Sequence, residues 1–325
     1  MAVTDKANML CILKILQEYS DENHILKMKD LTSKLKLEYD IKPDRRTVYG
    51  AINTLIDMGY DISTYEENGI GYYLREREFE PAEIRLLIDA VYSFDYISKR
   101  QTEELLEKLR KQLSVNERKK YSYSSIIHTD KKSPNQEVFL NISLLDEAIN
   151  NKKKISFTYL DYDFDKKLKP RREESYIVNP YQMVCENKKY YLICITEGHD
   201  SPGYYRVDMM KDIQILDDNI DFSKKDVNLD TASKVLFAYA GAPQQVTIRG
   251  DKTALRYVIE SFGNDVSIFK KGDDQFEATF KTSLDGMFYW ALQYMQHVEV
   301  LSPASLRERI LKTLENDNAY KKLDS

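Results

Sequence analysis

Arg206 stands in a segment, residues 203–215, whose other residues are largely apolar or aromatic, as in a buried β-strand. Two earlier segments, residues 176–185 and 189–196, have the same strand character. A guanidinium group in such a strand needs a carboxylate partner or an anionic ligand, because removing an unpaired charge from water is costly. Asp208 lies two residues on, and so on the same face of an extended strand. Arg206 is therefore either an anion anchor or one half of an internal ion pair.

Aromatic and basic side chains accompany these strands. Residues 150–172 contain eight basic and three acidic residues, a local charge of +5, and end in Arg171 and Arg172. Tyr190 and Tyr191 lie in the middle strand, where at most one of two neighbours faces a given side. Rings that stack and guanidinium groups that bind phosphate at two points suit an anion with an aromatic face. The alternative for Tyr190 is plain packing in the core.

A second group of side chains suits phosphates and base edges: Arg45, Arg46, Thr47, Tyr49 and Asn53. The spacing predicts a helix over residues 45–58, with Asp44 as its N-cap and Gly59 just past its end. Residues 27–46 hold seven basic and four acidic residues, a local charge of +3, in a chain whose net charge is −5. Positive charge is therefore concentrated near the start of this helix.

The elements around this helix have the order of a winged helix-turn-helix. Helices are expected over residues 5–19 and 29–38, with Leu31, Leu35 and Leu37 facing inward in the second. Two strands, residues 60–65 and 70–74, are expected on either side of a turn at 66–69. In this fold the helix after the turn enters the major groove with its N-terminal end, which predicts double-stranded DNA as partner. The alternative is a winged helix that only holds another protein.

Residues 80–113 are expected to be helical and to carry two apolar stripes, of which the first is Ile84, Leu87, Ile88 and Val91. These stripes pack within the chain or pair with a second copy, and a homodimer is expected because helix-turn-helix proteins usually bind as dimers. Residues 119–136 are polar and are interpreted as a linker.

The second half contains two further groups of elements. A helix at 140–150 and a strand at 155–160 join the three strands already named to form a small curled sheet or barrel. A loop with a short helix near 234–240 follows. Residues 245–301 then alternate strand, helix, strand, strand, helix, strand, which is the order of a ferredoxin-like fold, before a last helix at 304–314. Phe288 and Trp290 are expected in its core.

Composition excludes several classes of protein. Cys11, Cys185 and Cys194 lack metal or disulfide spacing, and the four histidines lie far apart, so neither a metal site nor a cofactor is expected. No Gly-rich phosphate loop or nucleophile motif is present, so no enzyme is expected. No apolar run reaches the about 20 residues that span a membrane, and no secretion signal opens the chain. A cytoplasmic protein is expected.

Tyr190-Tyr191-Leu192 resembles the Trp-Tyr-Leu motif of the bacterial WYL domain, with Tyr in place of Trp. The surrounding residues also resemble this family: Phe157-Thr158-Tyr159, Arg171-Arg172, Val178-Asn179-Pro180-Tyr181 and Tyr205-Arg206-Val207-Asp208. The N-terminal half is similar to the winged-helix regulators that carry WYL domains, through Arg45-Arg46-Thr47-Val48-Tyr49 and Gly71-Tyr72-Tyr73-Leu74. The resemblance covers the chain from near residue 5 to at least residue 215.

The resemblance implies an α+β multidomain chain in four parts. These are a winged helix-turn-helix (1–78), a helical linker that is a candidate for dimerisation (79–138), an SH3- or Sm-like barrel, the WYL sensor (139–220), and a ferredoxin-like C-terminal extension (221–325). It implies a homodimeric transcriptional regulator that senses an anionic ligand, a nucleotide or single-stranded nucleic acid. The ligand-binding candidates are Tyr159, Arg171, Arg172, Tyr181, Tyr190, Tyr191 and Arg206.

The sequence departs from the family pattern at two places. Met209 stands where the family usually has an arginine, and Gly50 and Ala51 replace an often basic and an often acidic residue in the recognition helix. The first departure bears on the ligand and the second on the operator. The alternative function is a non-enzymatic accessory protein whose WYL domain binds single-stranded nucleic acid or a protein partner.

Overall fold

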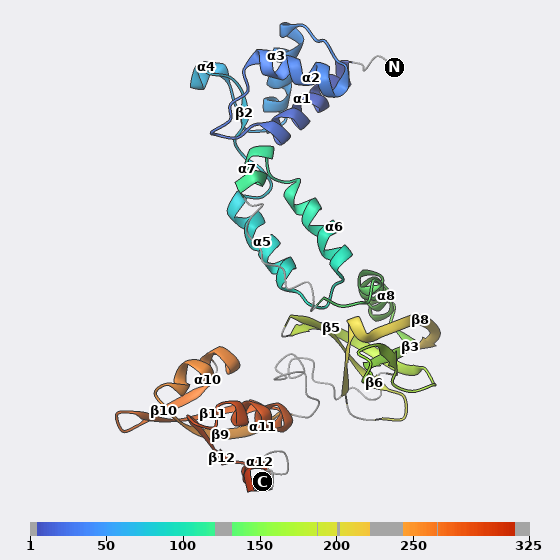
Figure 1. The fold of residues 1–325 in the computed structure, drawn as a ribbon, viewed down its shortest axis with the longest axis vertical. Coiled ribbons are helices and arrows are strands. Elements are labelled where there is room, and N and C mark those ends of the chain that lie inside the picture. The colour runs from blue at the N-terminus through green and yellow to red at the C-terminus, as the bar shows by residue number, and fades with distance from the viewer. Residues whose placement is uncertain are drawn as a thin grey trace. The chain divides into compact units, whose positions relative to one another are not determined.

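A computed structural model describes residues 5–120, 132–186, 188–199, 202–221, 243–264 and 266–315. The chain divides into two compact units, residues 1–136 and 137–325. Figure 1 shows the elements along the chain. The four-part division of the chain stays a prediction.

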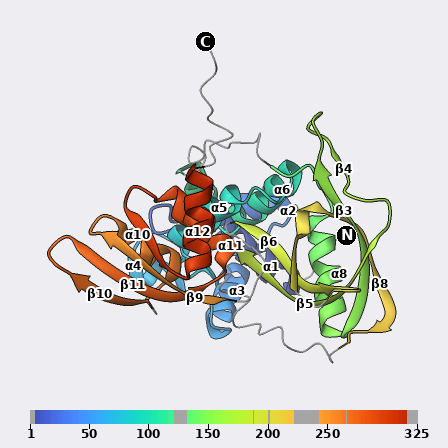
Figure 2. The ribbon, with the colours of Figure 1, turned by 90° about the horizontal axis from the view of Figure 1, so that it is seen from below.

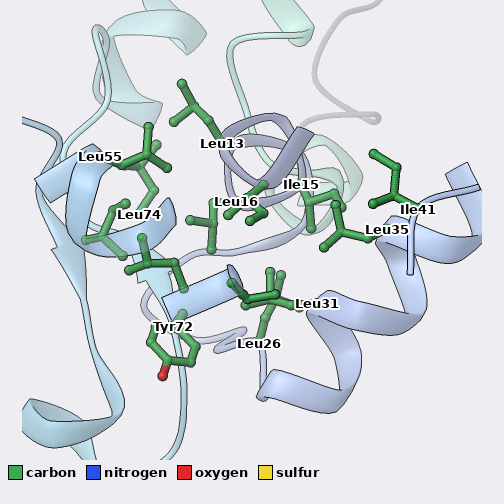
Figure 3. Close-up of a cluster of buried hydrophobic side chains, with 14 residues drawn as sticks. Leu13, Ile15, Leu16, Leu26, Leu31, Leu35, Ile41, Leu55, Tyr72 and Leu74 are labelled. Carbon is green, nitrogen blue, oxygen red and sulfur yellow. The ribbon is translucent and has the colours of Figure 1, made fainter. Parts of the chain in front are cut away.

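Three helices open the first unit: α1 (Asp5–Tyr19), α2 (Met28–Tyr39) and α3 (Arg45–Asp57). The predicted N-cap is confirmed, since the Asp44 carboxylate accepts the Thr47 backbone N–H at 2.8 Å. The helices bury one apolar cluster, which includes Leu16, Leu31 and Leu55 (Figure 3). Leu37 was wrongly expected to face inward: it is 84% exposed, because it lies on the face of α2 opposite that of Leu31 and Leu35.

The segment after α3 forms a shorter pair of strands than expected. β1 (Ile62–Ser63) pairs antiparallel with β2 (Tyr73–Leu74), and a helical turn, α4 (Tyr65–Asn68), replaces the tight turn between them. Thr64 and Glu67 stabilise that turn as a capping box. Tyr72 also exchanges two backbone hydrogen bonds with Leu26, at 2.8 and 2.9 Å. Gly71 allows this close approach, since a Cβ atom there would lie 2.2 Å from the Leu26 carbonyl oxygen.

The helical stretch after β2 is broken into three: α5 (Pro81–Ser93), α6 (Lys99–Arg110) and α7 (Val115–Lys120). Ile84, Ile88 and Val91 are buried as expected, but Leu87 is 37% exposed. Ser98 caps α6 through the Gln101 N–H. Lys132 Nζ donates to the backbone carbonyls of Val91, Tyr92 and Phe94, and so satisfies the end of α5. The middle of the predicted linker, residues 121–131, lies outside the described residues.

The second unit begins with α8 (Val138–Asn150) and a curled antiparallel sheet. Its strands are β3 (Lys153–Tyr162), β4 (Leu168–Pro170), β5 (Tyr176–Glu186), β6 (Lys189–Thr196), β7 (Pro202–Arg206) and β8 (Met210–Asn219). Their order is β4-β3-β5-β6-β7, and β8 returns to pair with β3, which curls the sheet. The single strand expected over residues 203–215 is wrong, because a 3₁₀ turn (Val207–Met209) divides it. Asn141 Nδ2 donates to the carbonyls of Val207 and Met210 and holds this turn.

The C-terminal elements follow the expected order: β9 (Gln244–Asp251), α10 (Ala254–Phe262), β10 (Ser267–Lys271), β11 (Gln275–Thr282), α11 (Leu284–Gln293), β12 (Val298–Ser302) and α12 (Ala304–Glu315). The strands form one antiparallel sheet in the order β10-β11-β9-β12. Trp290 is buried in its core and donates to Ser261 Oγ at 2.9 Å, and Phe288 is buried nearby, as expected. The helix expected near 234–240 lies outside the described residues.

Candidate nucleic-acid interface and ligand site

The first turns of α3 present most of the predicted DNA-binding side chains to solvent. Arg45, Arg46, Tyr49 and Asn53 are exposed, and Thr47 is half-buried. The Thr47 backbone N–H holds the pKa of the exposed Asp44 carboxyl below its usual value. Among the described residues, no carboxylate lies within 4.0 Å of the Arg45 or Arg46 guanidinium group. Both positive charges are therefore available to a ligand.

Tyr49 is held against the segment between α4 and β2. Its ring packs edge-on to that of the buried Tyr72, with centroids 6.3 Å apart. Arg75, directly after β2, is not a comparable free cation, because it bonds Asp61 and Glu67 at 2.8 and 2.7 Å. The Arg75 charge is therefore balanced, unlike those of Arg45 and Arg46.

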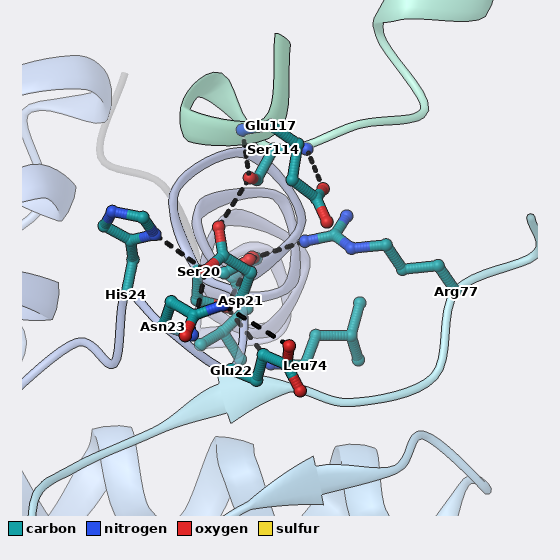
Figure 4. Close-up of polar contacts among 10 residues, drawn as sticks. Ser20, Asp21, Glu22, Asn23, His24, Leu74, Arg77, Ser114 and Glu117 are labelled. Atoms are coloured by element: carbon teal, nitrogen blue, oxygen red, sulfur yellow. Dashed lines mark hydrogen bonds and ion pairs between the residues drawn. The ribbon is translucent and has the colours of Figure 1, made fainter. Parts of the chain in front are cut away.

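A polar cluster ties the end of α1 to α7 (Figure 4). Ser114 Oγ donates to Asp21 Oδ2 at 2.8 Å, and His24 Nδ1 lies 2.7 Å from the other carboxylate oxygen. Burial would raise the pKa of Asp21, but these partners outweigh it and lower the pKa. Arg77 donates to the carbonyls of Gln17 and Ser20. Ser114, directly before α7, thus anchors the start of that helix to the three-helix head.

Further contacts strengthen this junction. Arg118 forms a two-point ion pair with Glu18, at 2.7 and 2.8 Å, between α7 and α1. A cleft of about 410 Å³ adjoins the junction, and its lining carries charges of both signs, among them Asp21, Arg77, Glu117 and Lys120. These contacts fix α7 against the end of α1.

Four aromatic rings cluster inside the curled sheet of the second unit: Phe157, Tyr159, Tyr176 and Tyr205. Their centroids lie 5.0 to 6.4 Å apart. Arg171 lies over the Tyr159 ring, at 5.1 Å from its centroid, and Arg172 lies 3.6 Å from that of Tyr176. Two of the predicted ligand residues, Arg171 and Arg172, therefore contact aromatic rings of this cluster.

Tyr176 and Tyr205 were not among the predicted ligand residues. The alternation of side chains between the two faces of a strand could have identified them. Tyr176 shares a strand face with the buried Val178, and Tyr205 is paired in register with the buried Leu192.

The three arginines of this region differ in how their charge is balanced. Arg171 bonds Asp161, at 2.8 and 3.2 Å, and Arg206 bonds Asp208, at 2.7 and 3.1 Å. Asp208, the candidate partner identified from the sequence, is therefore the ion-pair partner of Arg206. Arg172 donates only to the backbone carbonyls of Glu174 and Ser175, and no carboxylate of the described chain lies within 4.0 Å of it. Arg172 alone of these three keeps an unbalanced charge.

The remaining predicted ligand residues are divided between different surroundings. Tyr191 is paired in register with Arg206 and shares its sheet face, whereas Tyr190 packs against the buried core cluster. Tyr181 contacts the Asp221 carbonyl at 3.4 Å and belongs to no ring pair of the cluster. Met209 is 5% exposed in the core, so the usual arginine position is used here for packing.

Comparison with known families agrees with this architecture. Residues 141–215 match the family model of the WYL domain, and residues 242–316 match that of the WCX domain. Over 289 residues the chain is 24% identical to "Uncharacterized HTH-type transcriptional regulator YobV" of Bacillus subtilis (strain 168), covering 83% of this chain and 88% of that protein. The chain belongs to the WYL-domain transcriptional regulators. The predicted family resemblance is confirmed.

Two solved structures are similar to this WYL-domain regulator at low identity. Proteasome accessory factor B/C (PafBC) of Arthrobacter aurescens is 14% identical with a TM-score of 0.29; the match covers 96% of this chain and 48%, about half, of that one. A structure described as a CRISPR Cas-related protein is 11% identical with a TM-score of 0.39, covering 99% of this chain and 92% of that one. Scores this low establish no shared arrangement.

Two features are absent from the described part of this WYL-domain regulator. No group of three or more His, Cys, Asp or Glu side chains there is placed to hold a metal ion. No helix there is both long and apolar enough to cross a membrane.

Proposed function

We propose that this regulator binds double-stranded DNA through the first turns of α3. The observation that carries the proposal is the exposure of Arg45 and Arg46 without a carboxylate partner in the described chain, followed by Tyr49 and Asn53 on the same exposed surface. Helix-turn-helix proteins contact base edges with the N-terminal residues of the second helix of the motif. Three helices followed by the β1–β2 pair support a winged helix-turn-helix assignment for residues 1–78.

Binding to genomic duplex fragments at several salt concentrations tests this proposal. Affinity should fall with rising salt, because each neutralised phosphate releases counterions. Arg45→Ala with Arg46→Ala should reduce the affinity at least 10-fold, about 1.4 kcal/mol or more, and should lower the salt slope by about 2. Lys99→Ala with Arg100→Ala is the matched control, since these residues are likewise an exposed basic pair at the start of a helix.

The outcome separates this function from an accessory role. Equal duplex affinity for both double variants, or affinity that does not respond to salt, contradicts the proposal. It would favour a scaffold role for the head, with binding activity confined to the WYL domain.

The WYL domain is proposed to bind an anion that carries an aromatic ring, a nucleotide or single-stranded nucleic acid. Arg172 supports this proposal, since it lies over a ring and keeps an unbalanced charge beside the Tyr159–Tyr176–Tyr205 cluster. A guanidinium group can bind phosphate at two points while a base stacks on a ring. An SH3- or Sm-like barrel here and a ferredoxin-like C-terminal fold are part of the proposal, supported by the strand orders.

Titration with ATP and with oligothymidylate tests the ligand site and separates the two sources of phosphate. Arg172→Ala should weaken the binding of the true ligand about 10-fold, the loss of one charge-assisted contact. Arg256→Ala is the control, since Arg256 is an exposed arginine beside the Tyr257 ring in the C-terminal domain. Equal effects of the two substitutions contradict a site at Arg172.

Two copies are proposed to act together on DNA, with ligand binding shifting the pose of their heads. The contacts of Ser114 with Asp21 and of Arg118 with Glu18 support the route, because they tie the helices after β2 to the head. Sedimentation at increasing protein concentration tests the homodimer, and a monomer at every concentration contradicts it.

A further inference from the structure

β10 is an open edge of the C-terminal sheet. It pairs with β11 on one side and with no other described strand on the opposite side (Figure 2). All five of its residues are exposed, and Phe269 and Ile268 are 63% and 38% exposed. An edge strand with exposed apolar side chains is a ready template for another strand.

The two edges of this sheet differ in regularity. β12, at the other edge, has a shift of register between Val300 and Ser302, an irregularity of the kind that blunts an edge. β10 pairs with β11 through all five residues without a shift. Lysines also discourage edge pairing, but both lysines of β10 have carboxylate partners: Lys270 lies 3.4 Å from Asp273 and Lys271 lies 3.3 Å from Glu277. β10 is therefore the regular edge of the sheet, and its lysines protect it only weakly against pairing with another strand.

The sequence of β10 is complementary to itself. In an antiparallel pair of two β10 strands, the register that overlaps all five residues places Phe269 opposite Phe269 of the second copy. The same register sets Lys271 opposite Ser267 and Lys270 opposite Ile268, so no lysine faces a lysine. Cross-strand aromatic pairs stabilise a sheet and opposed like charges destabilise it. A shift that centres the pair on Lys270 would oppose two ammonium groups and lose part of the overlap.

We propose that β10 pairs antiparallel with β10 of a second copy of this chain, about a two-fold axis at Phe269. The pairing joins two four-stranded sheets into one continuous sheet and satisfies the outward backbone groups of both edges. A two-fold contact uses the same surface on both copies, as this one does. The inference rests on the homodimer proposed above and names its surface. Strands this short bury a small area, so a dimer that dissociates on dilution is expected.

Cysteine cross-linking tests the register. In a Cys185→Ser background, which removes an exposed native thiol, Phe269→Cys should give a covalent dimer under mild oxidation, because its Cβ atoms would face each other. Ser267→Cys alone should not, since its two copies would lie about 13 Å apart along the strands. A mixture of the Ser267→Cys and Lys271→Cys proteins should cross-link again. Failure of Phe269→Cys, or equal cross-linking by Ser267→Cys alone, overturns the pairing.

Sedimentation of the full chain gives a second measurement. Phe269→Asp should shift the protein to monomer at concentrations where the wild type is dimeric. Its melting temperature should be nearly unchanged, because the ring is largely exposed. Phe164→Asp is the control, since Phe164 is a fully exposed phenylalanine in the WYL domain. A Phe269→Asp protein that stays dimeric overturns the β10 interface but not the homodimer, whereas a monomeric wild type overturns both.

Discussion

Arg206 donates to both carboxylate oxygens of Asp208, although the two residues belong to different elements. Arg206 ends β7 and Asp208 lies in the 3₁₀ turn. The Asp208 side chain is 2% exposed and that of Arg206 is 27% exposed. A carboxylate so deeply buried requires a cation beside it, because an uncompensated buried charge is strongly destabilising. The arginine of this strand is therefore a structural partner first, and any ligand contact would be additional.

Arg206→Ala should lower the free energy of unfolding by about 3 kcal/mol, since it removes the cation that balances the buried Asp208 carboxylate. Urea denaturation measures the change. Adding Asp208→Asn should restore part of the loss, because the second substitution removes the negative charge that Arg206 balanced. Stability that is unchanged in Arg206→Ala would show that the ion pair contributes nothing to the fold.

Asp161→Asn should strengthen ligand binding. The Asp161 carboxylate occupies Arg171, and an incoming phosphate has to displace it. Exposed ion pairs contribute about 0.2–1 kcal/mol, so affinity should rise up to about 5-fold. Fluorescence anisotropy with labelled oligothymidylate measures it. Asp146→Asn, on the exposed surface of α8, makes the same change in net charge away from the rings, and an equal gain there would point to bulk charge instead.

Gly71→Ala should destabilise the first unit by about 2 kcal/mol or more. The new Cβ atom would lie 2.2 Å from the Leu26 carbonyl oxygen, so the backbone pairing of Leu26 with Tyr72 has to shift. Gly50→Ala is the matched control in α3, where a Cβ atom would meet nothing within 4 Å. It should stabilise the helix by about 0.5–1 kcal/mol. Thermal unfolding separates the two, and equal melting temperatures would contradict the close approach at Gly71.

The Asp21 cluster should make the stability of the first unit depend on pH in acid. Hydrogen bonds from Ser114 and its other partners overcome burial and lower the pKa of Asp21 in the folded chain. The ionised group therefore contributes its full stability above the unfolded pKa of about 3.9, and this contribution is lost as the pH falls through the lower folded pKa.

Asp21→Asn should accordingly be less stable than wild type at neutral pH and approach it below about pH 4. Urea denaturation at several pH values measures the difference. Glu22→Gln, which changes the exposed neighbouring carboxylate, serves as control. A difference between wild type and Asp21→Asn that is constant from pH 7 to pH 3 would contradict the role given to this carboxylate.

The elements that sequence reasoning located well are those specified by local chemistry. Asp44 caps α3 because its side chain reaches an N–H three residues away, and this needs no distant partner. The strand-helix order from β9 to β12 likewise follows from short periodic segments. The main error in predicting the elements arose where contacts between residues far apart in the sequence determine the local structure. Asn141 holds the 3₁₀ turn from 66 residues away, so residues 203–215 could not be recognised as two strands.

The sequence by itself determined that this chain carries two separate concentrations of basic side chains, at residues 27–46 and 150–172, and that Arg206 needed a counter-charge or an anionic ligand. Only the tertiary structure decided how those charges are satisfied. In the structure Arg206 forms an ion pair with Asp208, and Arg171 forms one with Asp161. Arg172 lies over the Tyr176 ring, and Arg45 and Arg46 are exposed. The physical reason is that helix and strand signals act over a few residues, whereas ion pairs and ring stacking depend on which strands become neighbours.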